Sequence, residues 1–447
     1  MKVAIIGAGW AGMAAAMSVV QAGHYATVFE SARAVGGRAR TISTKDVNGA
    51  PLALDNGQHI LIGAYAESLR LMRLVGIDPE AALLRLPLAL RFADGNGLQW
   101  PDLPPPWDAV TGIARARGWH WRERLALLRL AYRWQRARFV CPPQTTVAEL
   151  CAALPPKLLQ EFIDPLCVAA LNTAAHEASG QVFLRVLQDS LFGGRGGSNL
   201  LLPRVDLGDV FPQAAARWLR AHGAIVRTGA RVQSVVAAGP GGWSVDGSLF
   251  DAAILATAST ESARLVSQCA QTAPFTMAVP LCDWAAGAQA LRFEAITTVY
   301  AQGSAGPDGH TLSAPMLALR SHATHPAQFV FDRGQLGGRA GLLAFVVSTS
   351  QGERAHIEQQ VREQAQAELG ISELRVVQTV VEKRATFACT PALQRPGAAI
   401  VPGLWACGDY IDGPYPATLE GAVRSGTAAG LAVGASDSIN ASASASD

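Results

Sequence analysis

The sequence predicts an α/β fold in which a parallel sheet covered by helices is assembled from separate stretches of the chain. Three observations support this prediction. A buried strand, a glycine-rich turn and a small-residue helix follow one another in VAIIGAGWAGMAAA, residues 3–16. A second apolar strand, residues 26–29, ends on an acidic residue. Strand patterns of the same kind return after long intervening segments, in AIVRTG, AAILAT and LWAC at residues 224–229, 252–257 and 404–407.

The glycine-rich turn has the spacing of a Rossmann-like dinucleotide-binding site. Gly7 is expected to make the tight turn, Gly9 to let a pyrophosphate approach the backbone, and Gly12 to let the helix pack closely on the strand. The first turn of this helix would present unpaired backbone N–H groups to the phosphates. Glu30 lies about where an acidic residue binds a ribose hydroxyl in such domains.

Composition excludes several classes of function. The chain has 447 residues, enough for two or three domains, of which 49% are hydrophobic and 16% charged. A net charge of +2 is too small to indicate nucleic-acid binding. The seven cysteines form no C-x-x-C pair and have no companion histidine at metal-ligand spacing, so we expect reduced thiols, no metal site and a cytoplasmic location. The sequence contains no charge-free run of about 18 apolar residues, so we expect no membrane span.

The distribution of strands and helices predicts two interleaved domains and a tail. The dinucleotide-binding domain, discontinuous in sequence, is assigned residues 1–82, 196–260 and 396–434. An inserted α+β domain, expected to hold the substrate, is assigned residues 83–195 and 261–395. The tail, residues 435–447, is low in complexity and is expected to be disordered.

Two further motifs indicate that the dinucleotide is FAD. The second strand is followed by SARAVGGRAR, in which Gly37 lets the chain pass the flavin side and Arg38 can pair with charge near the pyrophosphate. Gly408 and Asp409 follow the strand LWAC, where a carboxylate can accept hydrogen bonds from the polyol that only a flavin carries. The helix expected to begin near Thr418 would point its positive end at the pyrimidine end of the flavin.

In combination these motifs resemble the superfamily of FAD-dependent amine oxidases and phytoene desaturases. The resemblance rests on the glycine turn, the acid at position 30, the GGR triplet and the segment GDYIDGPYPATLEGAVRSG, residues 408–426. It implies that FAD is held by Gly7, Gly9, Gly12, Glu30, Gly37, Arg38, Val232, Gly408, Asp409, Thr418 and Leu419. Val232, in ARVQSV, is implied to meet the adenine through its backbone.

Within this superfamily the chain is most similar to the bacterial hydroxysqualene dehydroxylases. The similar stretches are DNGQHILIGAY, LCVAALNT and LLPRVDLGDVFP, together with the C-terminal segment just quoted. The resemblance implies that hydroxysqualene, a lipophilic isoprenoid, loses its hydroxyl to give squalene in squalene and hopanoid synthesis. Hydride would pass from reduced FAD to an allylic cation, and an external reductant would then restore the reduced flavin.

Three alternatives stay open at this point. They are a carotenoid desaturase and an amine oxidase, both using FAD in the oxidative direction, and a flavin-binding protein with a structural role. Amine oxidases tend to place an aromatic residue where this chain has Thr418, which puts amine oxidation in doubt.

Three residues are predicted to act on the substrate. Loss of hydroxide from an allylic alcohol needs a proton donor and an apolar pocket for the cation. His59, in NGQHI, is the predicted donor, because this part of the chain passes near the flavin in the superfamily; a structural loop histidine is the alternative. Asn172 and Tyr415 are further candidates for orienting the hydroxyl, whereas Asp164 and Asp189 fit equally well as caps or ion-pair partners.

An arginine-rich stretch, residues 115–139, predicts either membrane contact or a buried helix. Its arginines alternate with Trp119, Trp121, Leu125, Leu128, Leu130, Trp134 and Phe139. A basic helix with aromatic anchors suits peripheral contact with anionic lipid, on the inner face of the cell membrane. A helix buried on one side, which extends its arginines to water, fits the same pattern.

Overall fold

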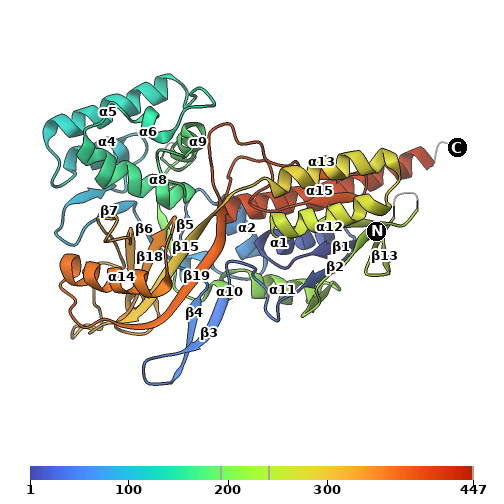
Figure 1. Ribbon diagram of the computed structural model, residues 1–447, viewed down its shortest axis with the longest axis horizontal. Coiled ribbons are helices and arrows are strands. Elements are labelled where there is room, and N and C mark those ends of the chain that lie inside the picture. The colour runs from blue at the N-terminus through green and yellow to red at the C-terminus, as the bar shows by residue number, and fades with distance from the viewer. Residues whose placement is uncertain (192–193, 240–241, 445–447) are drawn as a thin grey trace.

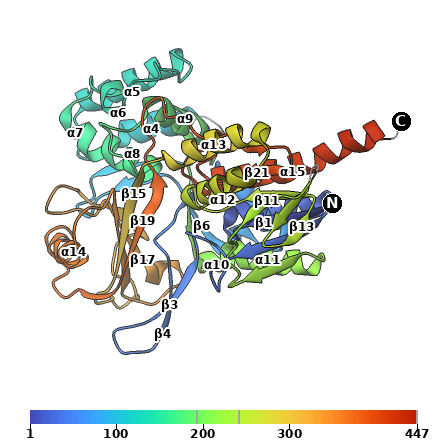
Figure 2. The same ribbon diagram turned by 45° about the vertical axis from the view of Figure 1, so that its right-hand side comes forward.

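The computed structural model describes residues 1–191, 194–239 and 242–444 of the chain. Two lobes lie side by side along the longest axis of the molecule (Figure 1). One lobe contains both ends of the chain and a mainly parallel sheet, and the other contains an antiparallel sheet beneath a group of helices (Figures 1 and 2).

The parallel sheet of the first lobe is assembled from three distant stretches of sequence. Its strand order is β10-β2-β1-β14-β21-β20, and every neighbouring pair is parallel except β20 with β21. The strands are β1 (Lys2–Ile6), β2 (Tyr25–Glu30), β10 (Ile225–Thr228), β14 (Ala252–Leu255), β20 (Ala399–Val401) and β21 (Leu404–Ala406). The predicted α/β class with a discontinuous parallel sheet is confirmed.

Two helices made largely of small residues pack against each other beside this sheet. They are α1 (Trp10–Gln21) and α15 (Leu419–Ser444), and a third helix, α11 (Pro212–Ala221), also contacts α1. A Cβ atom at Gly426 would overlap the carbonyl oxygen of Ala11, and one at Gly430 would lie 2.6 Å from that of Ala15. Glycine at these positions lets the backbones of α1 and α15 approach closely.

The C-terminal helix extends further than the sequence predicts. Residues 435–447 were expected to be disordered, but α15 continues to Ser444; residues 445–447 lie outside the described part of the chain. Alanine favours helix most strongly, and no proline or glycine follows Gly434 to end it.

The helices α12 (Ser259–Thr272) and α13 (Phe275–Gln289) belong with the first lobe, although residues 261–290 were assigned to the inserted domain. They pack on each other, α12 contacts β11 and α13 contacts β20. The indole Nε1 of Trp284 donates to the carbonyl oxygen of Gly397, 2.8 Å away. The strand β11 (Val235–Ala237) forms a small antiparallel sheet with β12 (Trp243–Val245) and β13 (Ser248–Phe250).

The second lobe is built on a five-stranded sheet of order β16-β17-β18-β15-β19. The strands are β15 (Phe293–Gln302), β16 (Met316–Ala318), β17 (Phe329–Asp332), β18 (Leu342–Ser348) and β19 (Arg375–Phe387). The helix α14 (Arg354–Leu369) contacts β19 and, with the short 3-10 helix η2 (Arg333–Leu336), completes this part. All strand pairs in the sheet are antiparallel.

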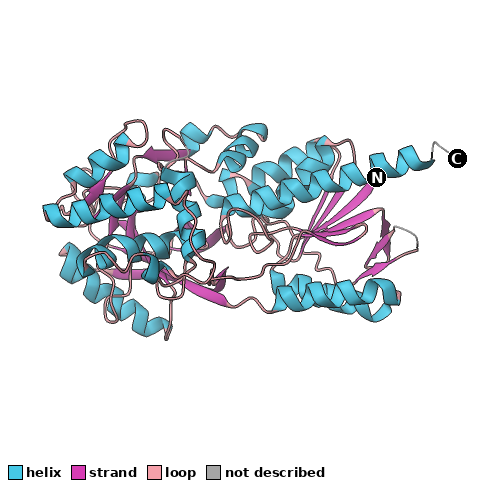
Figure 3. Ribbon diagram, turned by 90° about the horizontal axis from the view of Figure 1, so that it is seen from above, coloured by secondary structure: helices cyan, strands magenta, loops and turns pink. Residues whose placement is uncertain are grey.

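A group of helices from the first inserted piece lies over one end of this sheet (Figures 1 and 2), and Figure 3 shows helices around the strands of this lobe from above. They are α4 (Trp107–Arg115), α5 (Trp121–Arg136), α6 (Val147–Leu150), α7 (Pro156–Leu158), the π-helical turn η1 (Leu159–Ile163), α8 (Asp164–Leu171) and α9 (Gly180–Leu191). Among the described residues, no helix combines the length and the apolar character that a membrane span requires.

Short elements join the two lobes. The strand β9 (Leu200–Pro203) was assigned to the dinucleotide-binding domain, but it pairs with β5 (Leu61–Ile62) and β6 (Leu83–Leu86) outside the parallel sheet. Its four residues are all buried, as in a central strand, so its burial pattern does not reveal its partner. The remaining elements are β3 (Thr41–Lys45), β4 (Pro51–Asp55), β7 (Ala89–Arg91), β8 (Gly97–Gln99), α2 (Ala66–Leu74), α3 (Pro79–Ala82) and α10 (Leu207–Val210).

Candidate functional site

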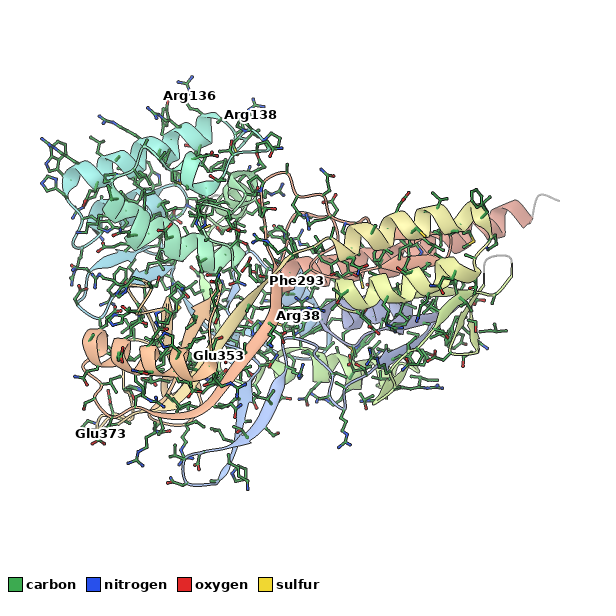
Figure 4. The ribbon with its side chains drawn as sticks, in the orientation of Figure 1. Arg38, Arg136, Arg138, Phe293, Glu353 and Glu373 are labelled. Atoms are coloured by element: carbon green, nitrogen blue, oxygen red, sulfur yellow. The ribbon has the colours of Figure 1, made fainter. Side chains whose placement is uncertain are left out.

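A cavity of about 670 Å³ begins at the carboxyl ends of β1 and β2 and continues into the second lobe. Its volume lies in the range of small-molecule and cofactor sites. Figure 4 shows Arg38, one of its lining residues, where the two lobes meet. Of the residues expected to bind FAD, ten line the cavity: Gly7, Gly9, Glu30, Gly37, Arg38, Val232, Gly408, Asp409, Thr418 and Leu419.

The three glycines of the turn differ in what surrounds them. Gly7 has a φ of +112°, and a Cβ there would lie 2.5 Å from the carbonyl oxygen of Ala256. A Cβ at Gly12, which does not line the cavity, would overlap the carbonyl oxygen of Gly7. A Cβ at Gly9 would meet only the Cα of Gly37, at 3.9 Å, so a larger side chain would extend into the cavity.

The N-terminus of α1 also opens onto this part of the cavity. Its N-cap is Gly9, which has no side chain to bond the first amides of the helix. Unpaired amides and the positive end of the helix dipole suit a phosphate group. The turn therefore fits a pyrophosphate that lies against the backbone.

Glu30 is held by backbone amides at the end of β2. Its carboxylate accepts hydrogen bonds from the N–H groups of Ala8 and Ala32, each at 2.8 Å, and it is only 9% exposed. A carboxylate has about four acceptor positions, so capacity for a ribose hydroxyl remains.

Arg38 and Asp409 bond directly to each other across the cavity wall. The distance from Arg38 Nη2 to Asp409 Oδ1 is 2.5 Å, and Arg38 Nη1 donates to the carbonyl oxygen of Ala385 at 2.7 Å. The nearby Asp409 carboxylate raises the pKa of the Arg38 guanidinium, more than burial lowers it. This ion pair connects the GGR segment of the N-terminal stretch to the GD segment of the C-terminal one.

The start of α15 supplies a second helix N-terminus. Thr418 Oγ1 accepts from the N–H of Gly421 at 2.9 Å, and the Thr418 carbonyl accepts from the N–H of Ala422 at 3.0 Å. The two preceding amides, of Leu419 and Glu420, come before the helical hydrogen-bond ladder begins. Thr418 and Leu419 line the cavity, so the residues present at both ends of the chain fit one FAD molecule.

The Glu420 side chain fixes this helix start to the rest of the lobe. It is fully buried and accepts hydrogen bonds from the N–H groups of Glu67 and Ser68, at 3.0 and 2.9 Å, in the first turn of α2. Arg424 Nε donates to it at 2.6 Å. Two helix N-termini are thereby held together next to the cavity.

The end of the cavity in the second lobe is mainly apolar. Its apolar lining comes from α8, β15, β17, β18 and β19 and includes Leu171, Ile296, Phe329, Phe331, Val346 and Val380. The polar side chains among its lining residues include Asn56, Gln58, His59, Asn172, Ser348, Glu382 and Thr386. A mainly apolar molecule that carries a polar group would fit this lining.

His59 lines the cavity as expected, and its hydrogen bonding determines which ring nitrogen carries the proton. Its Nδ1 lies 2.9 Å from the carbonyl oxygen of Gly57, which can only accept, so Nδ1 carries the proton of the neutral ring. Burial lowers the pKa of His59, and the charge of Arg38 lowers it further. At neutral pH Nε2 is therefore an acceptor, and only the minor imidazolium form can donate from it.

Asn172 also lines the cavity, but both ends of its amide are engaged within the protein. Nδ2 donates to Thr386 Oγ1 at 2.9 Å, and Oδ1 accepts from the N–H of Thr349 at 3.0 Å. The residue has a left-handed backbone, with φ of 43°, at the end of α8. This geometry ties α8 to β19 and to the residue that follows β18.

Tyr415 is not among the described residues that line the cavity. Its ring lies under the guanidinium of Arg424, 4.6 Å from Cζ to the ring centroid, and its hydroxyl neighbours Asp189. Asp189 also pairs with Arg185 at 2.7 Å, whereas burial raises the pKa of Asp164 on α8. Neither aspartate lines the cavity.

Tyr65 is a cavity residue that the sequence analysis missed. It lines the cavity next to Thr418, and burial raises the pKa of its hydroxyl, so the phenol stays protonated at neutral pH. The sequence could have indicated it, because Tyr65 is the last residue of DNGQHILIGAY, one of the stretches similar to the dehydroxylases. Glu382 and Thr386 were missed as well, and their strand β19 carried no motif that marked them.

Comparison with known proteins finds relatives along almost the whole chain. The family model of flavin-containing amine oxidoreductases matches residues 10–431. A hydroxysqualene dehydroxylase of Rhodopseudomonas palustris is 28% identical over 459 residues, covering 95% of this chain and 96% of the relative. A zeta-carotene desaturase of Zea mays is 37% identical over 78 residues, covering 17% of this chain and 13% of the relative. A solved oxidoreductase structure from Methanosarcina mazei has a TM-score of 0.69 at 18% identity, covering 96% of this chain and 99% of that chain.

Proposed function

This chain belongs to the flavin-containing amine oxidoreductase family, its cofactor is FAD, and we propose that it reductively removes the hydroxyl group of hydroxysqualene to give squalene. The observation that carries the proposal is the likeness to a hydroxysqualene dehydroxylase over 95% of this chain, whereas the likeness to a carotenoid desaturase covers 17%. The ten lining residues named above would hold the FAD, which supplies hydride-transfer chemistry when bound.

The apolar end of the cavity supports an isoprenoid substrate. In the proposed reaction the carbon–oxygen bond breaks, the hydroxyl takes up a proton and leaves as water, and a carbon–hydrogen bond forms at the same carbon. The two electrons come from an external reductant by way of the flavin. Side chains such as Phe329, Phe331 and Val346 exclude water, which would otherwise capture an allylic cation.

His59 is the proposed source of the proton, in its imidazolium form. The neutral ring must first take up a proton at Nε2, and the bond from Nδ1 to Gly57 holds the ring in one orientation while it does so. Because burial disfavours the imidazolium, this proton is released more readily than from an exposed histidine. Asn172 would act by positioning α8, and no catalytic part is proposed for Tyr415.

The reaction can be tested directly with purified protein. Enzyme reduced with dithionite under anaerobic conditions is mixed with hydroxysqualene, and the products are separated by gas chromatography with mass detection. We expect squalene in an amount equal to the reduced flavin consumed. The proposal is wrong if hydroxysqualene is recovered unchanged while oxidised enzyme is bleached by a carotenoid precursor or an amine.

A further inference from the structure

The helix α5 has two different faces. Successive residues of an α-helix are rotated by about 100°, which places Leu127, Leu130 and Trp134 on one side. These three are buried against the protein. Trp119 and Phe139, which flank the helix, are buried too. Most of the apolar residues that were expected to contact lipid are therefore buried in the protein. For these residues the second interpretation, a helix buried on one side, holds.

The opposite face of α5 combines exposed aromatic and basic side chains. Trp121 and Tyr132 are each 60% exposed, and at about 100° per residue they lie within about 20° of each other around the helix axis. Arg122, Arg129, Arg133 and Arg136 occupy the adjoining part of the same exposed face.

Further exposed side chains lie on the segments that precede and follow α5 in the chain. Trp107, at the start of α4, is 63% exposed, and Val140, just after α5, is 63% exposed. Figure 4 shows the side chains of Arg136 and Arg138 extending outward from this end of the molecule. We name these residues the α4–α5 surface: Trp107, Trp121, Arg122, Arg129, Tyr132, Arg133, Arg136, Arg138 and Val140.

The charge of this surface is positive and uncompensated. Among the described residues, no acidic side chain forms an ion pair with the five arginines of the α4–α5 surface. The one acidic residue within α5, Glu123, accepts from the N–H of His120 at the start of the helix, at 2.6 Å. The net charge of the whole chain is only +2, so this concentration of arginine is a local property.

From this arrangement we propose that the α4–α5 surface binds the headgroup region of an anionic lipid bilayer. Tryptophan and tyrosine favour the boundary between headgroups and acyl chains, and arginine favours anionic headgroups. A nucleic-acid or acidic protein partner would match the charge, but it would leave the bulky exposed aliphatic and indole groups without an apolar environment. The proposal that this surface binds lipid does not depend on the proposed function. Only its use for loading a lipophilic substrate rests on that function.

Vesicle flotation of the full-length, FAD-loaded protein tests the proposal. We expect the protein to float with vesicles of phosphatidylcholine and phosphatidylglycerol, to float much less with phosphatidylcholine alone, and to be released by high salt. Each of Arg129→Gln and Arg133→Gln should lower the partition coefficient by about fivefold. The double variant Trp121→Ser/Tyr132→Ser should also lose binding.

Matched controls lie on other parts of the molecule. Phe275, on α13, is 84% exposed, and Arg362 is exposed on α14, so Phe275→Ser and Arg362→Gln should float like the wild type. Because all the substituted side chains are exposed, melting temperatures should not change. Equal flotation of every variant, no flotation of the wild type, or binding to soluble heparin in place of vesicles would overturn the proposal. Squalene formation from detergent-dispersed hydroxysqualene, measured in the same variants, reports separately on the proposed function.

Discussion

The two ends of the cavity bind by different means. At the dinucleotide end the backbone itself forms the surface, through the turn at Gly7 and Gly9 and the starts of α1 and α15. At the substrate end the surface is made of side chains from α8 and four strands, and a polar group such as Asn172 is already bonded to the protein. A backbone site demands specific residues at specific positions, whereas a side-chain pocket tolerates many sequences of similar volume.

The largest expected effect concerns the backbone end. Gly9 has φ of −74°, which any residue can adopt, and its Cβ direction leads into the cavity, so Gly9→Leu should fold but exclude the pyrophosphate. We expect FAD affinity to fall by a factor on the order of 10⁴, equivalent to two or three charge-assisted hydrogen bonds. Flavin absorbance after gel filtration and titration of the apoprotein with FAD measure this.

Gly287→Ala on α13 is the matched control, since a Cβ there has nothing within 4 Å. It should bind FAD normally. If Gly9→Leu bound FAD as tightly as the wild type, the backbone would not be the binding surface.

An intermediate effect is expected at the substrate end. His59→Gln should slow squalene formation by about 10²–10⁴-fold, the usual contribution of a general acid, with FAD affinity nearly unchanged. Because burial lowers the pKa of His59, the wild-type rate should rise as pH falls below neutrality, as the imidazolium becomes populated. This rise should be absent in the variant.

Tyr65→Phe provides the contrasting variant for this experiment, because it removes a phenolic hydroxyl that lines the cavity and stays protonated at neutral pH. A rate that is flat with pH near neutrality and lost in Tyr65→Phe would transfer the donor role from His59 to Tyr65.

The smallest expected effect lies beneath the substrate end, at Asp55. This buried carboxyl accepts from the N–H of Leu207 at 2.8 Å, and burial raises its pKa to about 6. The folded protein binds the proton of Asp55 more tightly than the unfolded chain does, so proton binding at Asp55 stabilises the fold. This stabilisation is present below pH of about 4 and is lost as the pH rises through about 6. Asp55→Asn should remove this loss, which amounts to at most about 3 kcal/mol.

Chemical denaturation of the wild type and Asp55→Asn across this pH range checks the prediction. The difference in free energy of unfolding should grow in favour of the variant between pH of about 4 and 6. A constant difference would mean that Asp55 does not titrate on folding.

The contrast between the backbone site and the side-chain pocket also explains how much of the molecule the sequence could predict. Five of the six strands of the parallel sheet were recognised from short, mostly apolar runs, and β20 was not. The flavin cofactor was recognised because the glycine and GD motifs serve backbone geometry. The residues assigned to FAD remain predictions that the cavity geometry supports. Residues 261–290 were assigned to the inserted domain, whereas α12 and α13 contact β11 and β20, because no motif in this segment marks the elements on which it packs.

The sequence also could not predict the direction in which each side chain points. Tyr65 and Tyr415 both occurred in stretches similar to the dehydroxylases, yet only Tyr65 lines the cavity. Likewise, the proton position on His59 follows from the carbonyl of Gly57, and no pattern of residue types encodes that contact. These features depend on tertiary neighbours rather than on local sequence.

The assembly of the parallel sheet from three distant stretches has a consequence for synthesis of the protein on the ribosome. Strands β1 and β2 emerge first, but β14 follows only after residue 252 and β21 only after residue 404. Since α1 packs along α15, the nucleotide-binding helix has no complete packing partner until the last tenth of the chain has been made. The packing of α1 and of the parallel sheet is therefore completed only late in translation, although β1, β2, α1 and α11 already contact one another earlier. Long-range pairing of this kind folds slowly and exposes surfaces that chaperones bind.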